Sequence, residues 1–194
     1  MSQAVTLSPP RTAVLADLIP GALARDVLLV AGGAGFVGLL AQVSVHIPGT
    51  PVPITGQTLG VLLVGAAYGW KRAAATITLY AALGLAGVPW FAGGSGGYVG
   101  ASFGYIIGFV LAATVAGFLA ERGADRTVLR SLPAMLAASA IVYAFGVTWL
   151  GFYAGMGVTE TLEKGLVPFL IGDAIKVALA AGLLPTAWAL TGRR

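Results

Sequence analysis

The sequence predicts an all-α integral membrane protein, in which six transmembrane helices form one compact bundle with both ends on the cytoplasmic side. Three observations predict this class. Of the 194 residues, 58% are hydrophobic and only 9% are charged, whereas soluble domains carry roughly 25% charged residues. The mean hydropathy is +0.92. Apolar runs of membrane-spanning length alternate with connections that differ in their content of lysine and arginine.

Six apolar segments are candidates for crossing a hydrocarbon core of about 30 Å, which takes about 20 helical residues. They cover residues 26–45, 54–70, 73–87, 102–120, 132–153 and 166–190. The second and third are short, so adjoining irregular segments or local thinning of the bilayer must complete those crossings. The 29 glycines favour close helix packing, because small side chains let helices approach one another in lipid.

Basic residues fall in alternate connections. They precede the first segment, join the second to the third and the fourth to the fifth, and end the chain: Arg11, Arg25, Lys71, Arg72, Arg122, Arg126, Arg130, Arg193 and Arg194. The intervening connections, 46–53, 88–101 and 154–164, contain one lysine and no arginine between them. Because cytoplasmic loops carry the excess of lysine and arginine, both termini are predicted in the cytoplasm. The basic residues therefore indicate topology rather than nucleic-acid binding.

The chain divides into a cytoplasmic leader, residues 1–25, and a transmembrane domain, residues 26–194. Apolar residues in the leader recur at helical spacing and are followed by a Pro-Gly break at 20–21. An interfacial helix on the cytoplasmic surface and a disordered leader are both compatible with this pattern. The absence of cysteine excludes disulfides and thiolate chemistry and leaves the redox compartment open.

The last apolar segment carries two charged residues, Asp173 and Lys176. A spacing of three places both on one face of a helix. Charges within a membrane span are costly and are functional candidates by default. A structural ion pair that fixes helix packing is the alternative, but apolar residues would do this without the cost of desolvating two charges. The pair therefore indicates a binding site.

The outer connection before the second segment contains three prolines, which impose an irregular path on residues 46–57. Thr55 and Gln57 are predicted at the mouth of the bundle, where irregular backbone is tolerated if it lines a cavity. A plain connector is the alternative. His46 has no second histidine or cysteine to complete a metal site, and it is interpreted as structural.

The connection at 88–100 combines glycines with aromatic residues. Gly93, Gly94 and Gly97 would let the backbone approach a ligand closely, and their amides could receive an anion. Aromatic rings in the same connection, Trp90, Phe91 and Tyr98, could stack on an apolar ring. The alternatives are a flexible linker for the glycines and an interfacial anchor for Trp90. No Lys-Ser/Thr pair follows the glycines, so they do not form a nucleotide loop.

Four motifs in one order resemble the BioY family: PITGQT at 53–58, GVPWFAGGSGG at 87–97, FGYIIGF at 103–109 and GDAIK at 172–176. Members are the biotin-binding S components of energy-coupling factor (ECF) transporters. The resemblance implies a six-helix bundle in a prokaryotic cytoplasmic membrane, which captures biotin from outside under a lid of the first and third outer segments. It also implies a membrane coupling subunit and two ATPase subunits as partners, no enzymatic activity and no cofactor.

The resemblance also assigns roles to residues. Asp173 would accept the two ureido N–H groups of biotin, and Lys176 would donate to the ureido carbonyl. The aromatic residues of the 88–100 connection would cover the apolar ring and chain. The backbone at 93–97 or the start of the fourth segment would hold the carboxylate, with Lys176 on the carboxylate as the main alternative.

In the first segment, small residues spaced by four, Ala31 with Gly35 and Ala34 with Gly38, match the spacing of the family's contact with its coupling subunit. An S component for another vitamin is the nearest alternative function, and a membrane protein without a transport function follows it. A membrane enzyme lacks the required groups, since the candidates are limited to His46, Asp173 and two glutamates in the 154–164 connection.

Overall fold

The structure is a computed structural model that describes residues 13–192. Seven α-helices occur in this part of the chain: α1 (Leu23–Gln42), α2 (Gln57–Tyr68), α3 (Trp70–Leu85), α4 (Phe103–Ala120), α5 (Val128–Ala154), α6 (Val158–Gly165) and α7 (Leu170–Leu190). Single 3-10 turns, η1 to η4, lie at Leu15–Leu18, Ala92–Gly94, Gly100–Ser102 and Val167–Phe169. Strands β1 (Ser44–Val45) and β2 (Ile54–Thr55) pair antiparallel, with Ser44 opposite Thr55.

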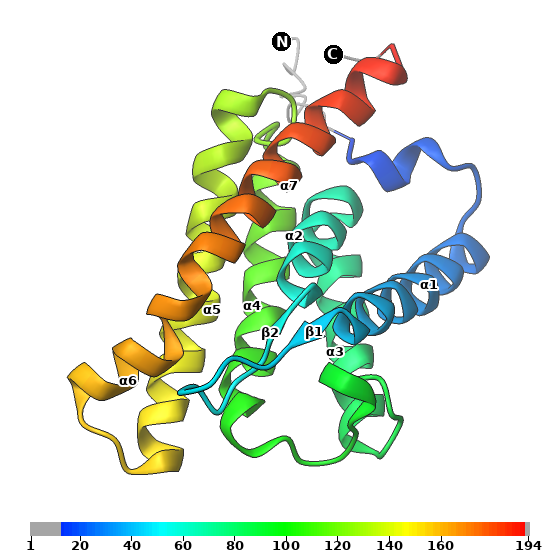
Figure 1. The fold of residues 1–194 in the computed structure, drawn as a ribbon. Helices are drawn as coiled ribbons and strands as arrows, with labels where there is room; N and C mark the ends of the chain where they lie inside the picture. The colour runs from blue at the N-terminus through cyan, green and yellow to red at the C-terminus, as the bar shows by residue number, and fades with distance from the viewer. Residues whose placement is uncertain (1–12, 193–194) are drawn as a thin grey trace, which may run out of the picture.

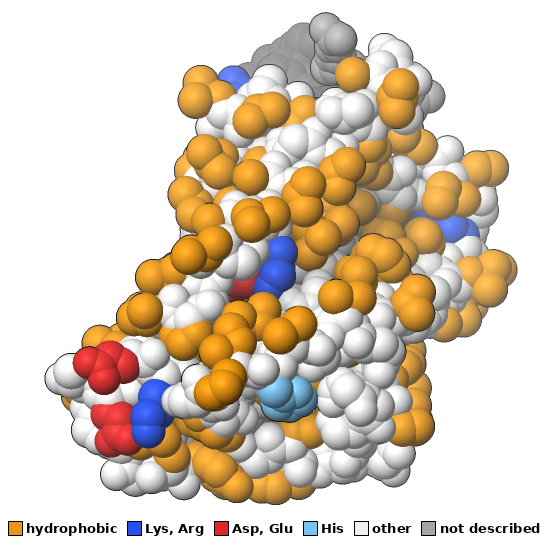
Figure 2. All heavy atoms as spheres, viewed as in Figure 1, with side chains coloured by type: hydrophobic (Ala, Val, Ile, Leu, Met, Phe, Trp, Pro, Cys, Tyr) orange, Lys and Arg blue, Asp and Glu red, His pale blue; other side chains and the backbone are white. Residues whose placement is uncertain are grey.

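Four helical stretches are long and apolar enough to cross a membrane: Leu23–Gln42, Gly100–Ala120, Val128–Ala154 and Val158–Leu190. Helix α2 is apolar but shorter. Hydrophobic side chains cover much of the face shown in Figure 2, and large apolar residues such as Leu28 point outward from α1. The predicted all-helical, multi-pass membrane class is therefore confirmed.

Helix α4 lies inside the bundle, between α2 and α3 on one side and α5 on the other (Figure 1). Small residues make this position possible. A Cβ atom on Gly117 would lie 2.5 Å from the backbone nitrogen of Trp70, and one on Gly65 would lie 2.9 Å from the carbonyl oxygen of Ala113. Helix α7 packs beside α5 and α2, whereas α1 packs on the opposite side against α2 and α3.

Three of the differences between the predicted and the observed boundaries have a direct structural cause. The first helix ends at Gln42 because residues 44–45 pair with β2. Gly69 alone, at φ +77°, separates α2 from α3, so Lys71 and Arg72 lie in the first turn of α3 and not in a loop. The last apolar stretch breaks at Val167–Phe169, where Pro168 cannot donate a helical hydrogen bond.

The end of the leader packs on the bundle as a single turn. Val14, just before η1, and Ala16, within it, are buried. Arg126 donates to the carbonyl oxygen of Ala13 at 2.7 Å. The same connection between α4 and α5 contacts Trp188 near the end of α7. Both ends of the described chain therefore lie at one end of the bundle (Figure 1). Arg11, Arg193 and Arg194 lie outside the described residues.

Candidate functional site

A cavity of about 300 Å³ lies between α2, α4, α5 and α7. It is bordered by the connection from α3 to α4 and by a two-stranded ribbon, which consists of β1, β2 and the loop between them. Its volume falls at the lower end of the roughly 300 to 1,000 Å³ typical of small-molecule sites. Its walls combine charged, hydroxyl, amide and aromatic side chains. They comprise His46, Val52, Pro53, Thr55, Gln57, Thr58, Phe91, Ala92, Ser95, Gly96, Tyr98, Val99, Ser102, Tyr105, Ile106, Phe109, Val142, Tyr143, Phe169, Asp173 and Lys176.

The predicted charged pair lies in this cavity. Lys176 Nζ lies 2.6 Å from Asp173 Oδ1, and the residue Asp173 is only 8% exposed. The break at Val167–Phe169 starts α7 afresh and places Asp173 in its first turn, where the helix dipole stabilises a carboxylate. The backbone break therefore places this side chain near a helix N-terminus inside the cavity.

Tyr143 on α5 completes the charged group. Its hydroxyl donates to Asp173 Oδ2 at 2.5 Å, so each carboxylate oxygen has one protein partner. Sequence reasoning missed Tyr143, because the two residues are 30 positions apart and no local pattern links α5 to α7. A tyrosine within an apolar span was the available signal, since its hydroxyl needs a partner in lipid.

Thr55 and Gln57 form a polar wall of the cavity at the start of α2. The Thr55 hydroxyl donates to Gln57 Oε1 at 2.9 Å. Gln57 Nε2 donates in turn to the hydroxyl of Tyr80 on α3. Strand β2 positions Thr55, because its pairing with β1 fixes the chain where it enters the helix.

The aromatic residues of the connection from α3 to α4 separate into two groups. Phe91 and Tyr98 line the cavity, Phe91 in the buried wall and Tyr98 at 62% exposure. Trp90 does not line it. The Trp90 ring packs on Gly38 of α1, where a Cβ atom would lie 3.2 Å from Trp90 Cβ, and its indole donates to the carbonyl oxygen of Tyr80 at 3.0 Å. The predicted ligand contact of Trp90 is therefore absent from this geometry.

The predicted glycines also lie outside the cavity lining, where Ser95 and Gly96 take their place. Gly93, Gly94 and Gly97 have positive φ angles of 65°, 76° and 77°, which glycine adopts without strain. The amide of Gly94 donates to Phe91 and that of Gly97 to Gly84. These glycines shape the turn, and two of their amides are not available to an anion.

Further aromatic side chains line the cavity from α4 and the turn before α7. Tyr105 donates through its hydroxyl to the carbonyl oxygen of Gly165 at 2.6 Å, and its ring lies 6.2 Å from that of Phe169. Phe109 lies one helical turn after Tyr105. Tyr105 and Phe109 were not predicted as site residues, although both lie in the motif at 103–109. Their spacing of four places them on one face of the helix. His46, interpreted as structural, also lines the cavity.

The two small-residue pairs of α1 differ in their exposure. Ala34 and Gly38 are buried, the latter under Trp90. Ala31 and Gly35 are exposed, and the space around Gly35 is open for at least 4 Å. Only the second pair is accessible to another protein. Ala34 and Gly38 are therefore unsuited to the predicted contact, because packing against α3 and Trp90 occupies their face of the helix.

The fold and cavity define a class: a helical membrane protein that encloses a small-molecule site containing a buried ion pair. Within residues 13–192 no cluster of three or more His, Cys, Asp or Glu could hold a metal ion. The sequence profile of the BioY family matches residues 7–193. The chain belongs to the BioY family.

Known proteins agree with this membership. The chain is 36% identical over 170 residues to a protein of Rhizobium etli named biotin transporter BioY, covering 81% of this chain and 89% of the relative. It is 38% identical over 160 residues to a probable biotin transporter BioY of Pyrococcus horikoshii, covering 81% and 92%. A crystal structure of the S-component for biotin from an ECF-type ABC transporter superimposes with a TM-score of 0.77 at 27% identity, covering 84% of this chain and 90% of that one.

Proposed function

We propose that this chain is the biotin-binding membrane subunit of an ECF-type uptake transporter, and not an enzyme. The observation that carries the proposal is the buried Asp173, Lys176 and Tyr143 group inside a cavity of small-molecule size. The names of the relatives and the structural match to a biotin S-component support the same ligand. Biotin is the transported ligand, and no cofactor takes part.

The ureido ring of biotin presents two N–H donors and one carbonyl acceptor. The Asp173 carboxylate accepts from the N–H groups, and Lys176 donates to the carbonyl while it balances the carboxylate charge. Tyr143 orients the carboxylate by occupying one of its lone pairs. The rings of Phe91, Tyr105 and their aromatic neighbours surround the apolar part of the ligand.

The valerate carboxylate has two candidate positions. Side-chain donors lie on the wall nearest the ribbon and the α3 to α4 connection, among them His46 and Ser102. They are better placed than the Gly94 and Gly97 amides, which already have acceptors. Lys176 on the carboxylate, with the ureido ring reversed, remains the alternative arrangement.

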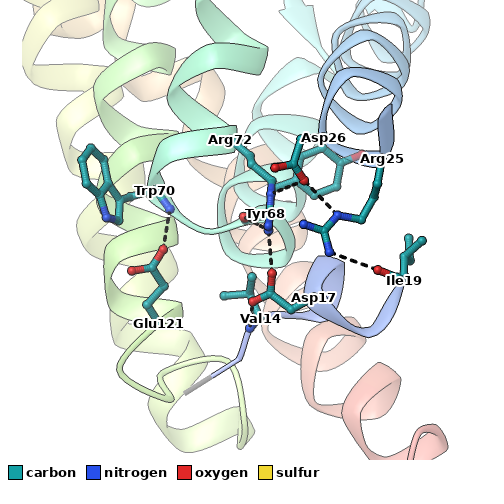
Figure 3. A network of polar contacts seen from close by, with 9 residues as sticks. All are labelled: Val14, Asp17, Ile19, Arg25, Asp26, Tyr68, Trp70, Arg72 and Glu121. Carbon is teal, nitrogen blue, oxygen red and sulfur yellow. Dashed lines mark hydrogen bonds and ion pairs between the residues drawn. The ribbon is translucent and has the colours of Figure 1, made fainter. Parts of the chain in front are cut away.

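Six crossings with both termini in the cytoplasm complete the proposed architecture, with α2 and α3 adding to the four longer spans. Arg72 of α3 joins the leader to α1 at the basic end, since it lies 2.8 Å from Asp17 and 2.9 Å from Asp26 (Figure 3). In the same region the amide of Trp70 donates to Glu121 at the end of α4. This basic end faces the cytoplasm of a prokaryotic cell.

The coupling subunit contacts α1 on its exposed Ala31 and Gly35 face, where small residues allow another helix to approach. Two ATPase subunits bind that coupling subunit and supply the energy for import. Biotin enters from the opposite side, where the ribbon and the connection from α3 to α4 close the cavity.

Binding of labelled biotin to the detergent-solubilised chain tests the function. Equilibrium dialysis suits this protein better than tryptophan fluorescence, because none of the four tryptophans lines the cavity. We expect saturable binding that unlabelled biotin displaces and that riboflavin and thiamine do not. Desthiobiotin keeps the ureido ring and lacks the thiophane sulfur. It should compete with biotin if Asp173 binds the ureido group. Binding of another vitamin in place of biotin would indicate a different S component.

A further inference from the structure

The connection between α3 and α4 changes direction at Trp90 and Phe91. Phe91 lines the cavity, whereas Trp90 packs on Gly38 of α1 and against the ring of Tyr80 at a centroid distance of 5.2 Å. One short stretch of backbone thus carries a wall of the site on one side and a contact with α1 on the other. Any movement of Trp90 away from α1 would also move Phe91.

Polar contacts hold this backbone in place. The carbonyl oxygen of Trp90 accepts from Gln42 Nε2 of α1 and from the Tyr80 hydroxyl of α3, both at 3.3 Å. Gln42 Nε2 also lies 3.3 Å from the carbonyl oxygen of Phe91 and 2.8 Å from that of Gly38. The Trp90 indole donates to the backbone of Tyr80. Side chains of α1 and α3 therefore both donate hydrogen bonds to the carbonyl group of Trp90.

The contacts continue into the cavity wall. Gln57 donates to the Tyr80 hydroxyl, which donates to the carbonyl of Trp90. Gln57 accepts in turn from Thr55, so the donors run in one direction from the cavity to the connection. Tyr80 and Trp90 are not among the cavity-lining residues. Tyr80 contacts the connection from α3 and Trp90 belongs to it, and neither side chain lines the cavity.

The connection has the backbone freedom to swing if these contacts are lost. Gly87 and Gly100, near its two ends, have φ angles of 107° and 49°, in the region that glycine adopts most readily. Further glycines at positive φ lie between them. Rotation about the two ends would take Phe91 and Ser95 out of the cavity wall and open the site.

We infer that Gln42, Tyr80 and Trp90 form a latch that holds the connection between α3 and α4 closed and sets the rate at which ligand enters and leaves. The inference rests on the proposed function for the identity of the ligand. These three residues are positioning residues: they control access to the cavity through Phe91 and its neighbours. The latch predicts equal effects on association and dissociation, because both require the connection to open.

Rapid mixing of labelled biotin with the full chain, followed by filter capture at timed intervals, tests the latch with Trp90→Phe, which removes the indole donor, and Gln42→Leu, which removes the amide. Loss of a hydrogen bond worth about 0.5 to 1.5 kcal/mol should raise both rate constants about 2- to 10-fold and leave Kd nearly unchanged. Trp70→Phe, the same substitution at the far end of α3, should leave both rates unchanged. Faster dissociation with unchanged association would show instead that Trp90 binds ligand. A smaller bound fraction at unchanged rates would show a folding defect. Either result would overturn the latch.

Hydrogen exchange of the ligand-free chain separates failure of the latch from failure of the proposed function. The amide of Gly97 donates to Gly84 of α3 at 2.7 Å and should exchange about 2- to 10-fold faster in both latch variants. Unchanged exchange in Trp90→Phe and Gln42→Leu would overturn the latch whether or not the chain binds biotin. Faster exchange in the two latch variants, together with a wild-type chain that does not bind biotin, would refute only the ligand.

Discussion

Two side chains, Lys176 on α7 and Tyr143 on α5, contact the Asp173 carboxylate. These contacts determine how much affinity a substitution of Asp173 should remove. Removing the charge by Asp173→Asn leaves Lys176 buried without its counterion and removes the strongest acceptors for the ureido group. Hydrogen bonds to a charged group contribute about 1.5 to 3 kcal/mol each. We expect biotin binding to weaken by about 100-fold or more by equilibrium dialysis. Glu160→Gln, which breaks the exposed pair with Lys164, is the control and should bind normally. Wild-type affinity in Asp173→Asn would refute the site.

Tyr143→Phe separates orientation of the carboxylate from its charge. The substitution removes one hydroxyl donor to Asp173 Oδ2 and keeps the ring in the cavity wall. We expect a weakening of biotin binding by about 10-fold, in line with one hydrogen bond to a charged acceptor. Tyr68→Phe is the matched control, because Tyr68 lies at the end of α2 that is away from the cavity. This substitution should not change the affinity. Equal affinity in the two variants would show that Asp173 needs no orientation by Tyr143.

At the scale of the helices, a buried carboxylate, Asp125, links the connection between α4 and α5 to α7. Trp188 donates through its indole to Asp125 Oδ2 at 2.5 Å, and the Arg126 guanidinium lies 3.5 Å from the centre of the Trp188 ring. Burial raises the pKa of the Asp125 carboxyl above its ordinary value of 3.8, although the Trp188 bond and Arg126 oppose the shift. Folding therefore shifts this carboxyl towards its protonated form relative to the unfolded chain.

This shift has a definite sign in the pH dependence of stability. A carboxyl whose pKa is raised on folding contributes stability below its unfolded pKa and loses it as the pH rises through the folded pKa. Asp125→Asn cannot ionise. We therefore expect the Tm of the wild type to fall relative to that of Asp125→Asn as the pH rises from about 4 towards 7, measured by thermal melting in detergent. A constant difference across this range would show that Asp125 ionises equally in both states.

Helix packing against α4 depends on the absence of side-chain atoms at Gly117. A methyl group there would lie within 2.5 to 2.8 Å of three backbone atoms of α2 and its junction with α3. Backbone cannot yield as a flexible side chain can, so Gly117→Ala should destabilise the bundle by about 1 to 3 kcal/mol. Gly182→Ala in α7, with no atom within 4 Å of its Cβ position, is the control and should leave the Tm unchanged or raised. Equal Tm values for the two variants would show that the bundle does not require a glycine at position 117.

For the whole molecule, the proposed orientation can be tested with single cysteines, because the chain has none of its own. Glu163→Cys lies on α6 at the cavity end, and Arg130→Cys lies on α5 at the basic end. We expect a membrane-impermeant maleimide to label Glu163→Cys in intact cells and Arg130→Cys only after permeabilisation. The reverse pattern would place the cavity on the cytoplasmic side.

The sequence by itself determined the membrane class and the charged pair that lines the cavity. Lipid selects segments by composition and length, and both are properties of the chain before it folds. Asp173 and Lys176 were predictable as one site because a spacing of three is a local property of any helix. The family motifs also located residues that line the cavity, including Thr55, Gln57 and Phe91.

Only the tertiary structure decided which residues meet across elements. Tyr143 reaches Asp173 over 30 positions, and Trp188 reaches Asp125 over 63. The side of α1 that Ala34 and Gly38 occupy, and the direction in which Trp90 points, depend on how α1 packs against α3. Helical periodicity states which residues share a face but not what that face contacts. Contacts between distant segments depend on the packing of the whole bundle, which no local pattern specifies.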